Sequence, residues 1–363
     1  MFDIARIISL LSFWRRKKPK SPKHDTNIKC VIIGPVGSGK TALLVSLRQC
    51  LNTNSHSYIN RFKINLNTQM ESRTDQNILE NTSIEKQNNA FSIYESQLDH
   101  YFNRGLDFDA TRDEFFRLDF RLTVSALVDQ GKMKKNKTFE VEFNSFDGGG
   151  GLLLDSIRDI PKERVSKFIE SRKELEAELK KCETFVLCLP IEGTKLSRQA
   201  RRTLSDYLSR FKNTDEYHVQ QVVICFTKYE TLGLRYGRNA YRMLANASRA
   251  KLEIKRALEG SLRDIQQALW ALNHTKGKKV WCVPVSTYGF IPHNGGANLD
   301  PHHGLLRTRE SVSPLTTTID EPYRNDEAYR HFWRPFLTAD PFIFIATNIH
   351  ENTLIFPLDE VLI

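Results

Sequence analysis

The sequence feature that most constrains the fold is the segment GPVGSGKT at residues 34–41. An apolar, β-branched run at residues 28–33 (IKCVII) precedes it and is typical of a buried parallel strand. The residues that follow, ALLVSLRQCL at 42–51, have the composition of a helix. Strand, glycine-rich turn and helix in this order satisfy the pattern G-x-x-x-x-G-K-[ST]. The sequence therefore predicts an α/β fold built around a loop that binds phosphate groups.

The residue types in this loop suit a triphosphate. Glycines let the backbone wrap closely, so that successive N–H groups point at phosphate oxygens, and the helix N-terminus adds partial positive charge. We expect Lys40 to reach the β- and γ-phosphates and the Thr41 hydroxyl to bind Mg²⁺. The residues expected to contact nucleotide here are Gly34, Pro35, Val36, Gly37, Ser38, Gly39, Lys40, Thr41 and Ala42.

A second segment bears on the metal and the γ-phosphate. Residues 138–146 (TFEVEFNSF) alternate as a strand and end in Asp147, which is followed by glycines at 148–151. An aspartate that closes a strand beside the phosphate loop can hold the water shell of Mg²⁺. Gly150 can donate its N–H to the γ-phosphate and pivot when that phosphate leaves. The alternative interpretation is a flexible turn.

Two further runs have the pattern of buried strands that end in polar residues. Residues 222–226 (VVICF) lead into TKYE at 227–230. Residues 280–285 lead into STYG at 286–289. Both segments bear on which base and which reaction the phosphate loop serves.

In this order, the segments resemble the guanine-nucleotide motifs of the TRAFAC GTPases, the class that includes the Ras-like proteins. GPVGSGKT resembles the first motif, and DGGG at 147–150 resembles Asp-x-x-Gly. TKYE resembles Asn/Thr-Lys-x-Asp, and STYG resembles the Ser-Ala-Lys loop. The resemblance covers roughly residues 28–290. It implies a P-loop NTPase of the Ras-like G-domain type, with a mostly parallel sheet flanked by helices.

More narrowly, the chain resembles the bacterial double-GTPase families. Those proteins have a long segment before switch I and a C-terminal Arg-Pro-Phe…Asp-Pro-like stretch, compared here with residues 334–336 and 340–341. The implied organisation is a G domain at residues 28–290 with an insertion at 52–110, followed by a C-terminal extension at 291–363.

The resemblance also implies how the base is recognised. Lys228 would pack its stem over the base, and Glu230 would accept hydrogen bonds from the guanine N1 and N2 groups. The family pattern has Asp at this position, so the longer Glu230 side chain changes the reach and leaves ATP open as an alternative to GTP. Thr227 stands in place of Asn, a known variation in the class.

The STYG loop would support the edge of the base. Ser286 and Thr287 are its candidate contact residues. Tyr288 replaces the usual Lys, so the loop would contact guanine through backbone N–H groups alone.

Switch I should supply a threonine to the metal shortly before the strand at residues 117–128. Thr111, in FDATRDEFFRLDF, is the best candidate, and Thr68, Thr74 and Thr82 are weaker ones. The predicted metal ligands are therefore Thr41, Thr111 and Asp147, and the predicted catalytic residues are Lys40, Thr111 and Gly150.

One departure from the class bears on the rate of hydrolysis. Ras-like enzymes place a glutamine directly after Asp-x-x-Gly to orient the attacking water, and this chain has Gly151 there. Intrinsic hydrolysis should therefore be slow unless another group helps. Arg104, Arg112 and Arg158 are candidate internal arginine fingers, although each is more typical of a solvated surface cation, and a partner protein is the other source.

The N-terminus differs from the rest of the chain. Apolar residues recur near helical spacing in residues 1–14, and a basic cluster follows at 15–18. The formal net charge is +10 for the whole chain, and residues 1–23 hold seven Lys and Arg against one Asp. Residues 1–18 suit an interfacial anchor on an anionic membrane, and the alternatives are a helix packed on a partner or on the chain's own domain, and disorder. Residues 1–27 are thus predicted to be an amphipathic basic helix and a polar linker, with the linker at 15–27.

The remaining patterns point to ordinary packing. The six cysteines form no Cys-x-x-Cys pair and are expected to be buried reduced thiols of a cytoplasmic protein. Residues 239–273 predict a long helix or a helix pair, and residues 342–346 predict a final strand. No zinc spacing is present, and no nucleic-acid module, so nucleic acid is not an expected partner.

Together, the motifs predict a Mg²⁺-dependent switch that binds and hydrolyses GTP, with GTP or GDP and Mg²⁺ as cofactors. The alternatives are a P-loop ATPase, and a nucleotide-binding interaction module with little turnover. A second GTPase or an effector protein is an expected partner. The protein would be cytoplasmic, with residues 1–18 as a candidate contact to the inner face of the membrane.

Overall fold

A computed structural model gives the fold of this chain. It describes residues 27–35, 37–53, 62–68, 116–130, 133–147, 165–192, 196, 198–213, 215–290, 295–298, 335–350 and 354–363. The predicted helix at residues 1–18 lies outside this part of the chain, as does most of the predicted insertion at 52–110.

The described residues form an eight-stranded sheet with the order β2-β3-β4-β1-β5-β6-β7-β8. Its strands are β1 (Asn27–Ile33), β2 (Phe62–Thr68), β3 (Phe116–Gln130), β4 (Met133–Asp147), β5 (Thr184–Pro190), β6 (Gln221–Thr227), β7 (Lys279–Pro284) and β8 (Phe356–Pro357). Strands β4, β1, β5, β6 and β7 run parallel, whereas β2, β3 and β8 pair antiparallel with their neighbours.

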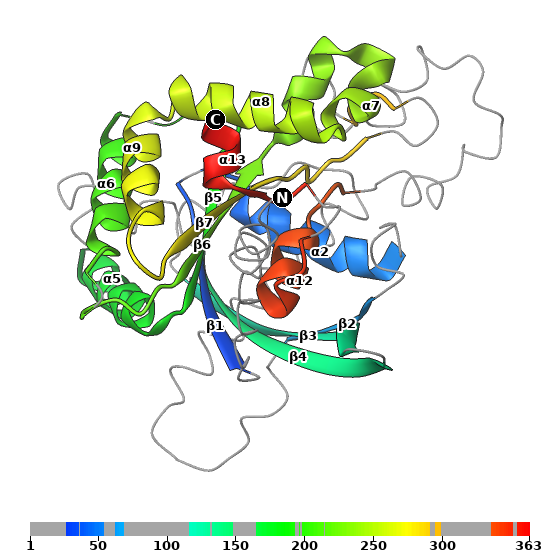
Figure 1. Cartoon of the computed structure of the whole chain (residues 1–363). Helices are drawn as coiled ribbons and strands as arrows, with labels where there is room; N and C mark the ends of the chain where they lie inside the picture. The colour runs from blue at the N-terminus through cyan, green and yellow to red at the C-terminus, as the bar shows by residue number, and fades with distance from the viewer. Residues whose placement is uncertain are drawn as a thin grey trace, which may run out of the picture.

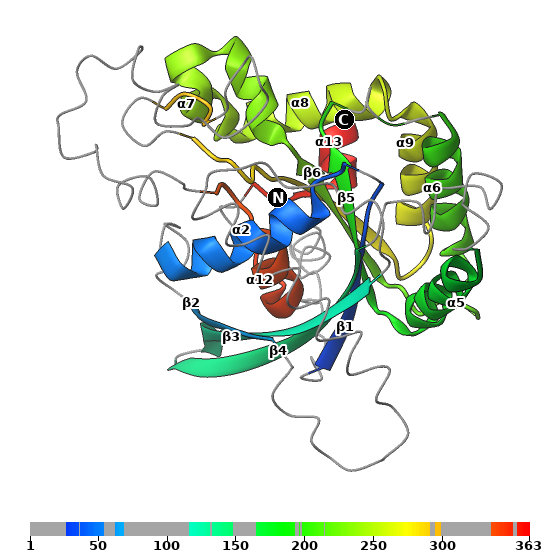
Figure 2. The same cartoon turned by 180° about the vertical axis from the view of Figure 1, so that it is seen from behind.

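Helices cover both faces of this sheet. They are α2 (Lys40–Thr53), α5 (Val165–Lys181), α6 (Arg198–Arg210), α7 (Ala240–Leu244), α8 (Ala247–Glu259), α9 (Arg263–Asn273), α12 (Asp340–Thr347) and α13 (Leu358–Leu362). Two 3₁₀ helices, η6 (Tyr229–Arg235) and η7 (Gly237–Asn239), lie between β6 and α7. Figures 1 and 2 show α5, α6 and α9 on one side of the central strands and α2 and α12 on the other, where β3 and β4 curl around them.

Alternation along the strands divides the apolar residues between two cores. In β1, Val31 and Ile33 pack toward α5, α6, α8 and α9, whereas Cys30 and Ile32 pack toward α2 and α12. Both faces of the central strands are therefore buried, which explains why these strands are apolar throughout. The mostly parallel α/β sheet with a loop–helix unit after β1 is that of a P-loop G domain, and the predicted fold class is confirmed.

The final strand predicted at residues 342–346 is wrong, because these residues belong to α12. Every residue of α12 is buried, so its sequence FIFIA lacks the polar face that marks an amphipathic helix. A short, fully buried apolar run cannot be assigned to helix or strand by periodicity alone. Pro341 in the first turn and Asn348 in the left-handed C-cap conformation mark its two ends.

Residues 239–273 form three helices rather than one or two. Asn246 interrupts the run because its side chain caps α8, accepting a 3.0 Å hydrogen bond from the Arg249 N–H. Gly260 follows the last residue of α8 and separates it from α9.

Strand β5 was not predicted from the sequence, although all of its residues are buried.

The cysteines that the structure describes are free and buried, as predicted: Cys30, Cys182, Cys188, Cys225 and Cys282. Among the helices within the described ranges, none combines the length and the apolar composition that a membrane span requires.

Candidate functional site

The predicted binding segments meet at the carboxyl edge of the parallel strands. Strand β1 ends at Ile33, β4 at Asp147, β6 at Thr227 and β7 at Pro284. All four run in the same direction, so their carboxyl ends lie at one edge of the sheet. Such an edge is where open α/β sheets bind ligands.

The phosphate loop leaves β1 in a turn that requires glycine at its first position. A Cβ at Gly34 would lie 2.5 Å from both the Cys188 carbonyl oxygen and the Ser38 Oγ. The Ser38 N–H closes the turn with a 3.1 Å hydrogen bond to the Pro35 carbonyl. Gly37 and Gly39 both have positive φ, which glycine adopts without strain.

Lys40, the first residue of α2, folds back over this loop. Its side chain is buried, and Nζ donates to the Gly34 carbonyl at 2.8 Å and to the Pro35 carbonyl at 3.4 Å. Its charge is therefore held at the mouth of the loop, beside the N-terminus of α2. Both are positive features that attract an anion.

The end of β6 is tied directly to the phosphate loop. Thr227 is fully buried, and its hydroxyl donates a short hydrogen bond to the Ser38 carbonyl. The Thr227 Cβ also lies 3.7 Å from the position that a Cβ on Gly39 would occupy. This contact ties the start of the TKYE segment directly to the phosphate loop.

Lys228 turns the chain from β6 into η6. It adopts φ 57° and ψ 30°, the left-handed region that residues with a side chain seldom occupy. Its carbonyl accepts from both the N–H and the hydroxyl of Thr231, at 3.0 Å and 2.7 Å. Unusual backbone of this kind persists where the surroundings hold it, and it is frequent at ligand sites.

Glu230 has the most unusual environment in the site. Its carboxyl group is buried and accepts a hydrogen bond from the Ser286 hydroxyl, which itself accepts a 2.8 Å bond from the Gly289 N–H. Burial raises the pKa of Glu230 from 4.5 to about 7, while the Ser286 hydrogen bond and the nearby Lys228 charge lower it. Its Oε2 atom has no hydrogen-bond partner among the described residues. Buried acceptors are normally satisfied, so this oxygen is positioned to accept from a ligand.

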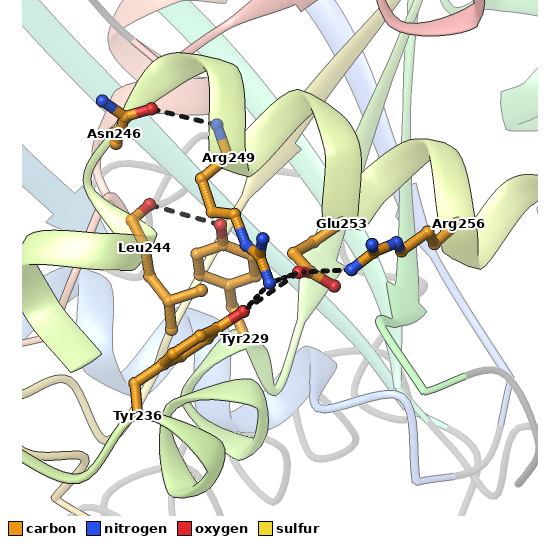
Figure 3. Close-up of polar contacts among 7 residues, drawn as sticks. All are labelled: Tyr229, Tyr236, Leu244, Asn246, Arg249, Glu253 and Arg256. Atoms are coloured by element: carbon orange, nitrogen blue, oxygen red, sulfur yellow. Dashed lines mark hydrogen bonds and ion pairs between the residues drawn. The ribbon is translucent and has the colours of Figure 1, made fainter. Parts of the chain in front are cut away.

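Tyr229 fixes the TKYE segment to the neighbouring parts of the chain. Its N–H donates to the Val285 carbonyl at 3.2 Å, and its hydroxyl donates to the Leu244 carbonyl at 3.2 Å. Figure 3 shows an ionic cluster beside it, in which the buried Glu253 accepts from three donors. The Glu253 Oε1 lies 2.8 Å from Arg249, 3.1 Å from Arg256 and 3.1 Å from the Tyr236 hydroxyl.

The predicted metal ligands Thr41 and Asp147 belong to elements that flank the loop. Thr41 is the second residue of α2. Strand β4 pairs with β1 so that Ser145 faces Ile32, which puts the Asp147 backbone level with Gly34. A hydroxyl and a carboxylate are hard oxygen donors, and Mg²⁺ typically takes one or two protein ligands together with phosphate oxygens. This donor set suits Mg²⁺.

Some predicted site residues lie outside the described residues, namely Val36, Thr111, Gly150 and Gly151.

Two contacts at the site were not predicted from the sequence. The Cys188 carbonyl limits the space at Gly34. Phe336 pairs with Ser286 through two backbone hydrogen bonds of 3.0 Å and 2.8 Å. The Arg-Pro-Phe resemblance pointed to Phe336 but not to this contact.

Comparison with known proteins identifies no family. No family model matches the chain, and no curated protein matches it. Two solved structures of the S. cerevisiae Ski7 GTPase-like domain match, one bound to GDP and inorganic phosphate and one bound to GTP. They have 12% and 13% identity, and each has a TM-score of 0.31 and covers 88% of this chain and 54% of that chain.

A bacterial selenocysteine-specific elongation factor, EF-Sec, matches with 12% identity and a TM-score of 0.27. That match covers 82% of this chain and 30% of the elongation factor. The chain therefore spans about half the length of the Ski7 chains, and less of the EF-Sec chain.

Proposed function

We propose that this protein binds GTP at the carboxyl edge of its sheet and hydrolyses it slowly, as a Mg²⁺-dependent switch. Supporting the triphosphate are the loop at residues 34–41, the buried Lys40 ammonium and the N-terminus of α2. One observation above all supports the base assignment: the buried Oε2 of Glu230, at the end of the segment tied to that loop, has no hydrogen-bond partner in the described part of the chain.

The chemistry of the bases explains why this oxygen favours guanine. Guanine presents N–H donors at N1 and N2 on one edge, and a carboxylate accepts from both. Adenine presents an acceptor at N1 and no amino group at C2, so it would leave the Glu230 oxygen unpaired. Sites that leave a buried polar group unpaired reject the wrong ligand strongly. Glu230 is therefore the residue that selects GTP over ATP in this proposal.

In the proposed active complex, Thr41 and Asp147 would hold Mg²⁺, with Thr111 as the switch I ligand. The ion would neutralise charge on the β- and γ-phosphate oxygens. Lys40 would contribute a second positive charge there, and the Gly150 N–H would contact the γ-phosphate. Gly151 offers no side chain to orient water, so turnover should be slow without a partner.

Competition binding tests the base assignment. GTP should displace a fluorescent guanine nucleotide from the purified protein, whereas ATP should displace it only at much higher concentration. Glu230→Ala should weaken GTP binding and spare ATP, and Lys40→Ala should weaken both. In Glu230→Gln an amide donor replaces a carboxylate oxygen, so this variant should prefer XTP, which has a carbonyl at C2. Equal binding of GTP and ATP by the natural protein would overturn the GTP assignment.

Single-turnover hydrolysis tests the switch. Slow hydrolysis that speeds up when a partner is added supports it. The absence of hydrolysis under every condition, with GTP tightly bound, supports instead a nucleotide-binding module, which the glycine at position 151 favours.

We also propose, from sequence alone, that residues 1–18 bind anionic membrane surfaces and that a second GTPase or an effector is the partner. Deletion of residues 1–18 should release the protein from liposomes that contain anionic lipid. Unchanged liposome binding after the deletion would contradict the membrane proposal.

A further inference from the structure

Phe336 contacts the base-binding segments from a distant part of the chain. Its N–H donates to the Ser286 carbonyl at 2.8 Å, and its carbonyl accepts from the Ser286 N–H at 3.0 Å. Strand β7 ends at Pro284, so Ser286 lies beyond the sheet. Both backbone polar groups of Ser286 are thus paired with Phe336, which serves as a local substitute for a neighbouring strand.

This pairing bears on Glu230 because Ser286 stands between them. The Ser286 hydroxyl accepts from the Gly289 N–H and hydrogen-bonds to the Glu230 carboxyl group. A shift in the Ser286 backbone would move that hydroxyl, and the Glu230 oxygens would follow or lose their partner.

The Phe336 ring also contacts the TKYE segment, through Tyr229. It stacks on Tyr229 with ring centroids 6.4 Å apart and planes 9° from parallel. The edges of Phe290 and Tyr241 meet it at 5.3 Å and 6.0 Å. Tyr229 lies between Lys228 and Glu230, so the ring constrains the same segment that the Phe336 backbone constrains through Ser286.

The position of Phe336 is itself set by the core. Leu337 follows with φ 57° and turns the chain, and Thr338 and Ala339 are fully buried. Helix α12 then packs against β3 and β4 on the other face of the sheet. The burial of α12 therefore determines where Phe336 meets the base-binding segments.

We propose that Phe336 is a positioning residue for base discrimination, acting through Ser286 and Tyr229 to keep one Glu230 oxygen available to guanine. The inference rests on the proposed GTP-binding function. It assigns a role in selecting the base to a residue about 50 positions beyond the last of the predicted base-binding loops, which the packing of α12 brings back to the site.

The test compares two matched substitutions, Phe336→Leu and Phe211→Leu. Phe211 is a buried residue just after α6 whose ring meets Phe185 at 4.9 Å and Tyr217 at 5.3 Å, near the amino ends of β5 and β6 and away from the base-binding segments. Phe336→Leu should weaken GTP binding about tenfold while ATP binding stays within about twofold, which corresponds to about 1.4 kcal/mol of lost discrimination. Phe211→Leu should lower the melting temperature and leave the GTP-to-ATP preference unchanged. Phe336→Met repeats the measurement if the leucine variant folds poorly.

A double-mutant cycle with Ser286→Ala separates positioning from general destabilisation. Because Phe336 acts in part through Ser286, the double variant should lose less GTP affinity than the two single losses multiplied together. Losses that multiply would overturn the inference, and so would an unchanged GTP-to-ATP preference in Phe336→Leu. A natural protein with no preference for GTP would overturn the proposed function and this inference together, so the two failures are distinguishable.

Discussion

Two glycines of the phosphate loop are under different constraints at the scale of single residues. An added Cβ at Gly34 meets the Cys188 carbonyl and Ser38 Oγ, whereas at Gly37 it meets no atom of the described residues within 4 Å. Gly34→Ala should therefore lower the free energy of unfolding by about 3 kcal/mol, through overpacking. Gly37→Ala, which bears only the strain of positive φ, should cost about 1 kcal/mol. Urea unfolding without nucleotide measures both, and equal losses would contradict the role given to Cys188.

Glu230 should make stability depend on pH. Its pKa is about 7 in the folded protein, above its ordinary value of 4.5. The folded state therefore holds the proton more tightly, and the contribution of Glu230 to stability is lost as pH rises from 4.5 through 7. Glu230→Gln removes this loss, so at pH 8 the variant should be more stable than the natural protein by about 3 kcal/mol.

The advantage of Glu230→Gln should shrink below pH 7 and vanish below 4.5, as measured by urea unfolding across that range. Asp340, whose pKa burial also raises to about 7, is present in both proteins and cancels in the comparison. Glu170→Gln, at an exposed position of α5, is the control and should stay within about 0.5 kcal/mol. An advantage that does not depend on pH would rule out an ionised Glu230 as its cause.

At the scale of elements, the ionic cluster in Figure 3 joins α8 to the end of η6, because Glu253 and Arg249 of α8 both contact the Tyr236 hydroxyl. Glu253→Ala removes the acceptor of Arg249, Arg256 and Tyr236 and should cost about 2–3 kcal/mol of stability. The matched control is Glu259→Ala on the same helix, where the exposed Glu259 pairs with the partly buried Lys255 at 3.9 Å and should contribute under about 0.5 kcal/mol. Chemical denaturation checks both, and equal effects would show that burial of Glu253 does not matter.

The same scale shows where sequence patterns mislead. The strand–loop–helix unit around residues 34–41 was predictable because its signals are consecutive and each agrees with the others. Helix α12 was not, because a helix buried on all sides carries no periodic polar face. The division of residues 239–273 depended on the Asn246 cap, a single side chain that a search for apolar spacing does not weigh.

For the whole molecule, nucleotide binding should appear as added stability. GTP with Mg²⁺ at about 100 times its dissociation constant should stabilise the fold by about 2.7 kcal/mol. Differential scanning fluorimetry would register this as a higher melting temperature. The shift should be absent in Lys40→Ala and smaller when EDTA removes Mg²⁺. ATP at the same concentration should give little shift, and an equal shift with ATP would contradict the base assignment.

What the sequence determined by itself is the local chemistry of the site. Consecutive residues specify the phosphate loop, Lys40 and the tetrapeptide that ends in Glu230, because turn geometry and strand direction follow from neighbours in the chain. Only the tertiary structure decided that Thr227 binds the loop, that one Glu230 oxygen lacks a partner among the residues the structure describes, and that Phe336 pairs with Ser286. These contacts join residues far apart in the chain, and the burial of α12 and the register of parallel strands bring them together, which no local pattern records.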